Sequence, residues 1–139
     1  MTTDTGLALR RAQGLTALRW VLSILIFIHG AYRLSVGGPP DFGAWLGSQG
    51  VPFGGAVAWV ITLVEIFGTL VLASGRFPRL QRPLALWFAM VLTGGLVMVH
   101  LPEGWFVVGA GRNGAEYAAT LIAGFLITAW VSPPVLQHR

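Results

Sequence analysis

The chain of 139 residues contains no cysteine and no lysine, and only 10% of its residues are charged. Without cysteine it forms no disulfide and no thiolate metal site, so any redox chemistry requires a bound cofactor or a partner protein. A net charge of +4 could suit a nucleic-acid partner, but the arginines stand at the ends of apolar stretches. That pattern indicates membrane orientation, and we expect no nucleic acid among the partners.

Apolar residues, by contrast, make up 55% of the chain. A lipid bilayer is the partner that suits such a composition, which is too apolar for a soluble domain of this size. A bilayer core of about 30 Å is crossed by about 20 helical residues. Four apolar stretches approach this length, namely residues 15–36, 54–74, 83–101 and 115–131. The sequence therefore predicts an all-α fold, an integral membrane four-helix bundle, with residues 1–139 as a single domain.

The positions of the arginines predict how the bundle is oriented, because cytoplasmic connections are enriched in basic residues. Arginines precede the first span, fill the second connection and end the chain; they are Arg10, Arg11, Arg19, Arg76, Arg79, Arg82 and Arg139. The first and third connections hold only Arg33 and Arg112 at their edges, offset by Asp41 and Glu103. Both termini are therefore expected in the cytoplasm, and the first and third connections outside.

The first connection is rich in glycine and proline and contains one amphipathic stretch. Asp41 is a candidate N-cap, and Phe42, Trp45 and Leu46 follow it on one side of a short helix. This pattern predicts an interfacial helix over the mouth of the bundle. The alternative is an irregular loop, which the same glycines and prolines also favour.

Chemistry-bearing side chains fall in or beside the predicted spans; they are His29, Arg33, Glu65, His100 and Glu116. Counted from the span midpoints at about 1.5 Å per residue, Glu65 lies near the midplane and the others lie outward of it. An ionisable group at the bilayer centre costs about 3 kcal/mol or more, so Glu65 should face the bundle interior, paired or protonated. His29 and Arg33 are four residues apart and share a helix face. The sequence thus predicts one outward-opening pocket lined by all of these side chains.

Structural interpretations stand beside the functional ones for the residues in the first two spans. His29 is a candidate partner for Glu65, but a protonated Glu65 could instead bond to a backbone carbonyl, Thr62 or Thr69. Arg33 could extend to the outer headgroups and leave the bundle interior.

The other two polar residues have ordinary interpretations as well. His100 ends the third predicted span, where an interfacial histidine needs no special role. Asn113 and Glu116 have the spacing of a capping box that opens a helix. The histidines and carboxylates come from separate helices and lack the HExxH or ExxH spacing of many metal sites, so we assign no metal ligands.

A series of short motifs runs from about Arg19 to Trp130. It comprises His29-Gly30 with Arg33, the Gly50-Val51-Pro52 turn, Glu65 with Gly68, Arg76, His100 before Gly104-Trp105-Phe106, and Gly114-Ala115-Glu116. In their order and spacing these motifs resemble the DoxX family of small bacterial membrane proteins. Arg33 stands where we expect lysine more often, which keeps the charge but changes its geometry.

The resemblance implies a multi-pass protein of the bacterial inner membrane that serves as an oxidoreductase component. Its relatives are linked to quinone-coupled sulfur oxidation and to membrane complexes that handle oxidative stress. On this basis the expected cofactor is a quinone held by His29, Arg33, His100 and Glu116. The candidate catalytic groups, which supply hydrogen bonds and protons, are His29, Glu65, His100 and Glu116.

Alternatives to this function remain open, and the sequence does not decide whether the chain is itself an enzyme. One is a non-catalytic accessory or assembly subunit that docks against a larger membrane or redox complex, with polar groups that fix helix register. Another is a small carrier of protons or hydrophobic solutes, which would also use a carboxylate near the midplane.

Reporter fusions test the predicted orientation. A fusion at Phe77 should report a cytoplasmic location because the second connection carries three arginines, whereas fusions at Gly47 and Gly109 should report an external one. Alkaline phosphatase, active only outside, and green fluorescent protein, fluorescent only inside, give complementary signals. An external Phe77 would invert the topology and place the polar residues in the inner half of the membrane.

Overall fold

The structure, a computed structural model, describes residues 2–106 and 114–132, so the expectations for Arg112, Asn113 and Arg139 lie outside the described residues. The described part consists of helices and short connections, without a strand, which confirms the all-α prediction. In chain order the elements are α1 (Thr2–Ser35), α2 (Pro39–Ser48), α3 (Gly54–Leu63), the π-helical segment η1 (Val64–Gly68), α4 (Thr69–Ser74), α5 (Pro78–Gly95), the π-helical segment η2 (Leu96–His100), α6 (Leu101–Glu103) and α7 (Ala115–Val131).

Three continuous helical stretches are long and apolar enough to cross a membrane: Asp4–Ser35, Gly54–Ser74 and Pro78–Glu103. The third begins at Pro78 and not at residue 83, because Pro78 opens the helix at a position where a missing N–H costs little, and Pro83 is accommodated inside it. The fourth predicted span, Ala115–Val131, is apolar but has only 17 residues. At about 1.5 Å per residue it falls slightly short of a core of about 30 Å.

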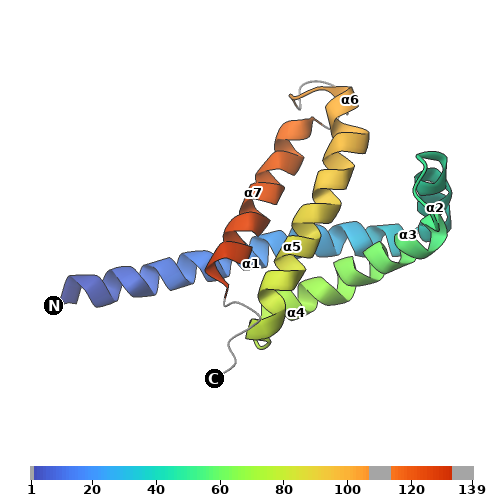
Figure 1. Cartoon of the computed structure of the whole chain (residues 1–139). Coiled ribbons are helices and arrows are strands. Elements are labelled where there is room, and N and C mark those ends of the chain that lie inside the picture. The colour runs from blue at the N-terminus through green and yellow to red at the C-terminus, as the bar shows by residue number, and fades with distance from the viewer. Residues whose placement is uncertain (1, 107–113, 133–139) are drawn as a thin grey trace.

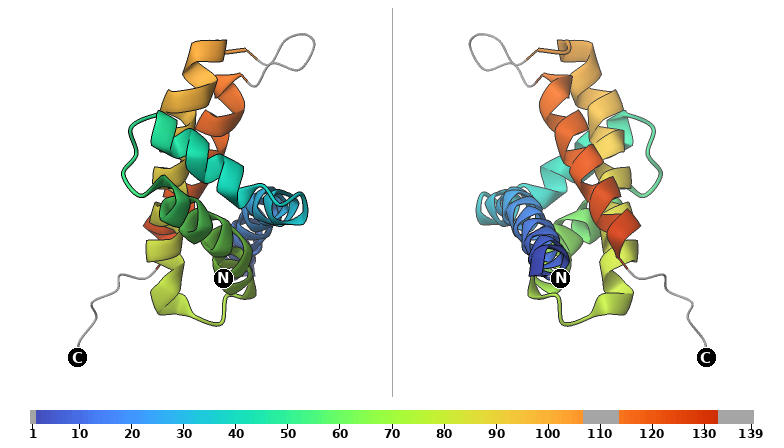
Figure 2. Two further views of the ribbon diagram at one scale, coloured as in Figure 1. Left: turned by 90° about the vertical axis from the view of Figure 1, so that its right-hand side faces the viewer. Right: turned by 90° about the vertical axis from the view of Figure 1, so that its left-hand side faces the viewer.

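The helices form two pairs that cross. α1 lies beside the continuous rod of α3, η1 and α4, while α5 lies beside α7, and the second pair crosses the first (Figure 1). α2 packs on α3 at one end of the first pair (Figure 2), and the N-terminal half of α1 projects beyond the other helices (Figure 1). The crossing brings α1, α4, α5 and α7 together.

The apolar core lies at this crossing. Its buried side chains are Leu22, Ile26, Leu72, Ala85, Phe88, Ala89, Leu121, Phe125 and Ala129. The rings of Phe88 and Phe125 have their centroids 5.2 Å apart, a contact that adds about 0.5–1.5 kcal/mol beyond burial. A Cβ at Gly124 would lie 3.0 Å from a methyl carbon of Leu22, so this glycine lets α7 approach α1 closely.

The outward surfaces of the helices are apolar too. Large apolar side chains that are roughly half exposed include Ile24, Ile28, Phe67, Leu86, Met90, Val97 and Leu126. In water a surface of this kind would aggregate, whereas lipid tails solvate it well. The exposed apolar surface therefore supports a lipid bilayer as the partner of these helices.

α2 confirms the helix predicted in the first connection, but its predicted N-cap is wrong. The N-cap is Gly38 and not Asp41, and Pro39 and Pro40 occupy the first two helical positions. Prolines are favoured there because the missing N–H groups would have no helical acceptor. Leu46 is the large apolar side chain that α2 buries.

Glycines allow α2 to pack tightly on α3. A Cβ at Gly43 would lie 2.6 Å from the Cα atom of Gly55, and a Cβ at Gly54 would overlap the carbonyl oxygen of Gly43. The backbones of the two helices thus touch with no room for a side chain at either position. This contact fixes α2 over the N-terminal end of α3.

Gly54→Ala should therefore destabilise the protein by about 1–3 kcal/mol, because the new methyl group must displace the backbone of α2. Gly55→Ala is the matched control, since a Cβ there meets nothing within 4 Å. Thermal unfolding of both variants in detergent, followed by circular dichroism, measures the difference. Equal melting temperatures would contradict the close packing of α2 on α3.

Candidate functional site

An ion pair between Arg33 and Glu65 joins α1 to η1. Nη1 of Arg33 donates to Oε2 of Glu65 at 2.7 Å and to Oγ1 of Thr62 at 3.1 Å. The side chains of Arg33 and Glu65 are 20% and 9% exposed. Glu65 is therefore paired inside the helical assembly, and Arg33 points to it instead of extending into the headgroups.

The partner of Glu65 is Arg33, not His29. His29 lies one helical turn before Arg33 on α1, where it is exposed. The hydroxyl of Thr69 does not reach the carboxylate either, since it donates to the backbone oxygens of Glu65 at 2.6 Å and Ile66 at 2.9 Å. Arg33 lies one helical turn beyond His29, and its longer side chain reaches the carboxylate of Glu65.

Gly30 brings the two halves of this pair together. A Cβ at Gly30 would lie 2.8 Å from Cβ of Glu65 and 3.1 Å from the backbone oxygen of Thr62. α1 and η1 therefore approach each other closely at this level. In the sequence, Gly30 stands out only as the residue after His29. That motif does not predict that Gly30 allows two helices to pack closely.

Two of the candidate residues lie in π-helical segments. η1 contains Glu65, and η2 ends at His100. A π-helical segment inserts an extra residue into an α-helix and turns the following side chains to new directions, and such segments are frequent at functional sites. The hydroxyl of Thr69 satisfies two carbonyl groups within η1. No sequence pattern had predicted either segment.

Arg33 also contacts α2. Its guanidinium carbon lies 4.4 Å from the centroid of the Phe42 ring, which is the geometry of a cation–π interaction worth about 0.5–2 kcal/mol. Phe42 in turn stacks on Trp45, with ring centroids 6.0 Å apart. α2 is thus tied to the ion pair through an aromatic contact.

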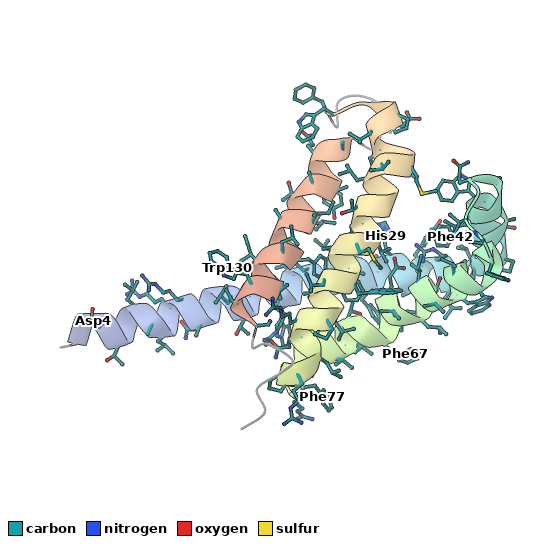
Figure 3. The ribbon with its side chains drawn as sticks, viewed as in Figure 1. Asp4, His29, Phe42, Phe67, Phe77 and Trp130 are labelled. Atoms are coloured by element: carbon teal, nitrogen blue, oxygen red, sulfur yellow. The ribbon has the colours of Figure 1, made fainter. Side chains whose placement is uncertain are left out.

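His29 lies on α1, one helical turn before Arg33, and Figure 3 labels it there. His100 is half-buried at the end of η2. The contact shown among the candidate residues is the Arg33–Glu65 pair, and the convergence of His29 and His100 on it stays a prediction.

Glu116 lies in the first turn of α7, where it is half-buried. α7 packs against η2, the segment that ends at His100. Its backbone N–H donates to the carbonyl oxygen of Trp105 at 3.1 Å. The N-cap of α7 is Gly114, and the capping box predicted with Asn113 lies outside the described residues.

Sequence reasoning missed one side chain of the site, Phe42, and considered Thr62 only as a partner of Glu65, not of Arg33. Thr62 accepts from Arg33 and itself donates to the carbonyl oxygen of Ala58 at 2.7 Å. Its position three residues before Glu65, on the same helix face, is the signal that could have identified its role. Phe42 was assigned only to the apolar side of the interfacial helix.

The described residues form no group of three or more potential metal ligands, so none is assigned to this site. Two cavities of the described chain lie elsewhere: one on α1 between Ala12 and Val21, the other at the turn between α4 and α5. Around the ion pair the structure presents hydrogen-bonding and ionisable groups, and the pocket lined by all five side chains stays a prediction.

The sequence profile of the DoxX family matches residues 14–101. This range covers well over half of the chain and includes His29, Arg33, Glu65 and His100, whereas Glu116 lies beyond it. No curated protein and no solved structure matches the chain.

Replacing Glu65 with lysine should prevent recovery of folded protein, because it places a second cation beside the partly buried Arg33. Glu65→Gln should be milder, since the amide keeps the shape and an acceptor for Arg33. Glu103→Lys, the same change at an exposed carboxylate, is the control. The fraction of monodisperse protein in size-exclusion chromatography measures each effect, and equal recovery of the two Glu65 variants would contradict the ion pair.

Proposed function

The chain belongs to the DoxX family, and we propose that it is a quinone-interacting component of an oxidoreductase in the bacterial inner membrane. The observation that carries the proposal is the Arg33–Glu65 pair, held between membrane helices one helical turn from His29. Ionisable groups inside a membrane protein are costly and usually mark a functional site.

The hydrogen-bond donors of Arg33 fit the head of a quinone, whose carbonyl oxygens accept hydrogen bonds. Arg33 uses Nη1 for its bonds to Glu65 and Thr62. Its Nη2 and Nε groups donate to none of the residues that the structure describes, so they remain for a ligand. A guanidinium also stabilises negative charge on a ligand oxygen more strongly than a neutral donor does.

Protons are the second requirement, since a bound quinone supplies chemistry in which electrons and protons are taken up or released together. We assign the holding and passing of these protons to His29, Glu65, His100 and Glu116. Because the chain contains no cysteine, the electrons pass to or from a partner redox protein or another bound cofactor.

The surroundings of His29 favour access from the lipid. His29 is exposed on α1, and its neighbours Ile28 and Tyr32 are 56% and 69% exposed. A quinone keeps its apolar tail among lipid tails, so its head would reach the Arg33–Glu65 pair from the side, past His29. Aromatic and aliphatic side chains on the helix surfaces would then contact the tail.

The alternative function, an accessory or assembly subunit, is favoured by one specific observation. Arg33 is already engaged by Glu65, Thr62 and Phe42, and these contacts alone fix α1 against η1 and α2. A pair of this kind can set helix register without binding a ligand. Purification in mild detergent separates the two functions, because a co-purifying quinone supports the first and a stoichiometric larger protein supports the second.

Binding of a short-tailed benzoquinone, followed by quenching of tryptophan fluorescence in the purified protein, tests the proposed site. His100→Ala and Arg33→Ala should each weaken binding about tenfold, the effect of losing one hydrogen bond to a ligand oxygen that carries partial charge. Arg33→Lys should retain most of the affinity, because lysine still donates and still pairs with Glu65.

Glu103→Ala is the control for this experiment, since Glu103 is exposed and is not assigned to the site. Circular dichroism of each variant establishes that the helices are intact. If His100→Ala and Glu103→Ala bind the quinone equally well, the quinone site is wrong and the accessory function becomes the better account.

A further inference from the structure

We infer that residues 75–82, which comprise the connection between α4 and α5 and the first residues of α5 and are called the turn below, bind the headgroup of an anionic phospholipid. Two helical stretches that are long enough to cross a membrane, Gly54–Ser74 and Pro78–Glu103, meet at this turn. Phe77 lies at its tip, at the far end of the molecule from α6 (Figures 1 and 3). The turn therefore lies at the membrane surface, at the level of lipid headgroups.

The turn carries positive charge that has no counter-charge in the described part of the chain. Arg76, Arg79 and Arg82 fall within it, and it contains no acidic residue. All three arginines are exposed, and none forms an ion pair with a described residue. Basic pockets beside membrane helices bind anionic lipid headgroups, and a phosphodiester supplies the missing negative charge.

Two of these arginines line a shallow cavity together with apolar neighbours. The lining consists of Arg76, Phe77, Pro78, Arg79 and Leu80. Phe77 is 51% and Leu80 46% exposed, although both are apolar. Cationic groups directly beside exposed apolar groups match a lipid, whose phosphate adjoins its acyl chains. They match free phosphate less well, because free phosphate has no apolar part.

Hydrogen bonds hold the turn in one shape before any lipid binds. Gly75 adopts a φ angle of +64°, and its carbonyl oxygen accepts from Nε2 of Gln81 at 3.3 Å. Nη1 of Arg19, on α1, donates to Oε1 of Gln81 at 3.3 Å. Arg76 and Arg79 are therefore presented on a turn that is tied to α1, and less ordering is needed when a headgroup binds.

Titration of the purified full-length chain with lipids, followed by native mass spectrometry, tests this proposal. Phosphatidylglycerol should bind about tenfold more tightly than phosphatidylcholine with the same acyl chains, because only the former headgroup is anionic. The double variant Arg76→Gln, Arg79→Gln should lose about 25-fold in affinity for phosphatidylglycerol, about fivefold for each arginine. Arg79→Gln alone should lose about fivefold, which provides a second test if the double variant does not insert.

The matched control is the double variant Arg10→Gln, Arg11→Gln, which removes the same charge from α1, outside the turn. Its affinity for phosphatidylglycerol should stay within about twofold of the wild type. Equal losses in the two double variants, or equal affinities for the two lipids, would overturn the proposal, because binding would then reflect general surface charge or apolar contact. Full competition by millimolar inorganic phosphate would overturn the lipid assignment and indicate a free-phosphate site.

Discussion

A carboxylate among membrane helices needs a partner, because leaving it charged and alone near the bilayer centre costs about 3 kcal/mol or more. Arg33 supplies that partner to Glu65 from the neighbouring helix, and the close approach at Gly30 makes their contact possible. The same guanidinium bonds to Thr62 and lies over Phe42, so α1, α2 and the helix of Thr62 and Glu65 meet at one group.

Much of the fold could be predicted because it depends on composition. Apolar length predicted the helical stretches, and the Gly/Pro-rich connection with its apolar side predicted a helix near Trp45. The cost of burying charge predicted that Glu65 would face the interior, paired or protonated, and the structure shows it paired with Arg33. These predictions required only residue types and helical spacing.

Other features depend on contacts between segments far apart in the chain, and the sequence alone did not predict them. Whether His29 or Arg33 pairs with Glu65 is decided by how closely α1 approaches η1. Glu65 and His100 lie in two π-helical segments. Each segment inserts one residue into its helix and so turns the side chains that follow, and no sequence pattern predicts it. Helix α2 begins at Pro39, two residues before the predicted cap Asp41. Proline is favoured at the first helical positions, where its missing N–H group costs little.

The free-energy coupling between Arg33 and Glu65 tests the central claim most directly. Unfolding free energies in detergent of the wild type, Arg33→Gln, Glu65→Gln and the double variant form a double-mutant cycle. Residues in direct contact give coupling energies of about 0.5–3 kcal/mol, and we expect the upper part of this range because the pair is charged and largely buried. The effects of mutations at independent sites add to within about 0.3 kcal/mol. A coupling energy below this value would therefore contradict the account.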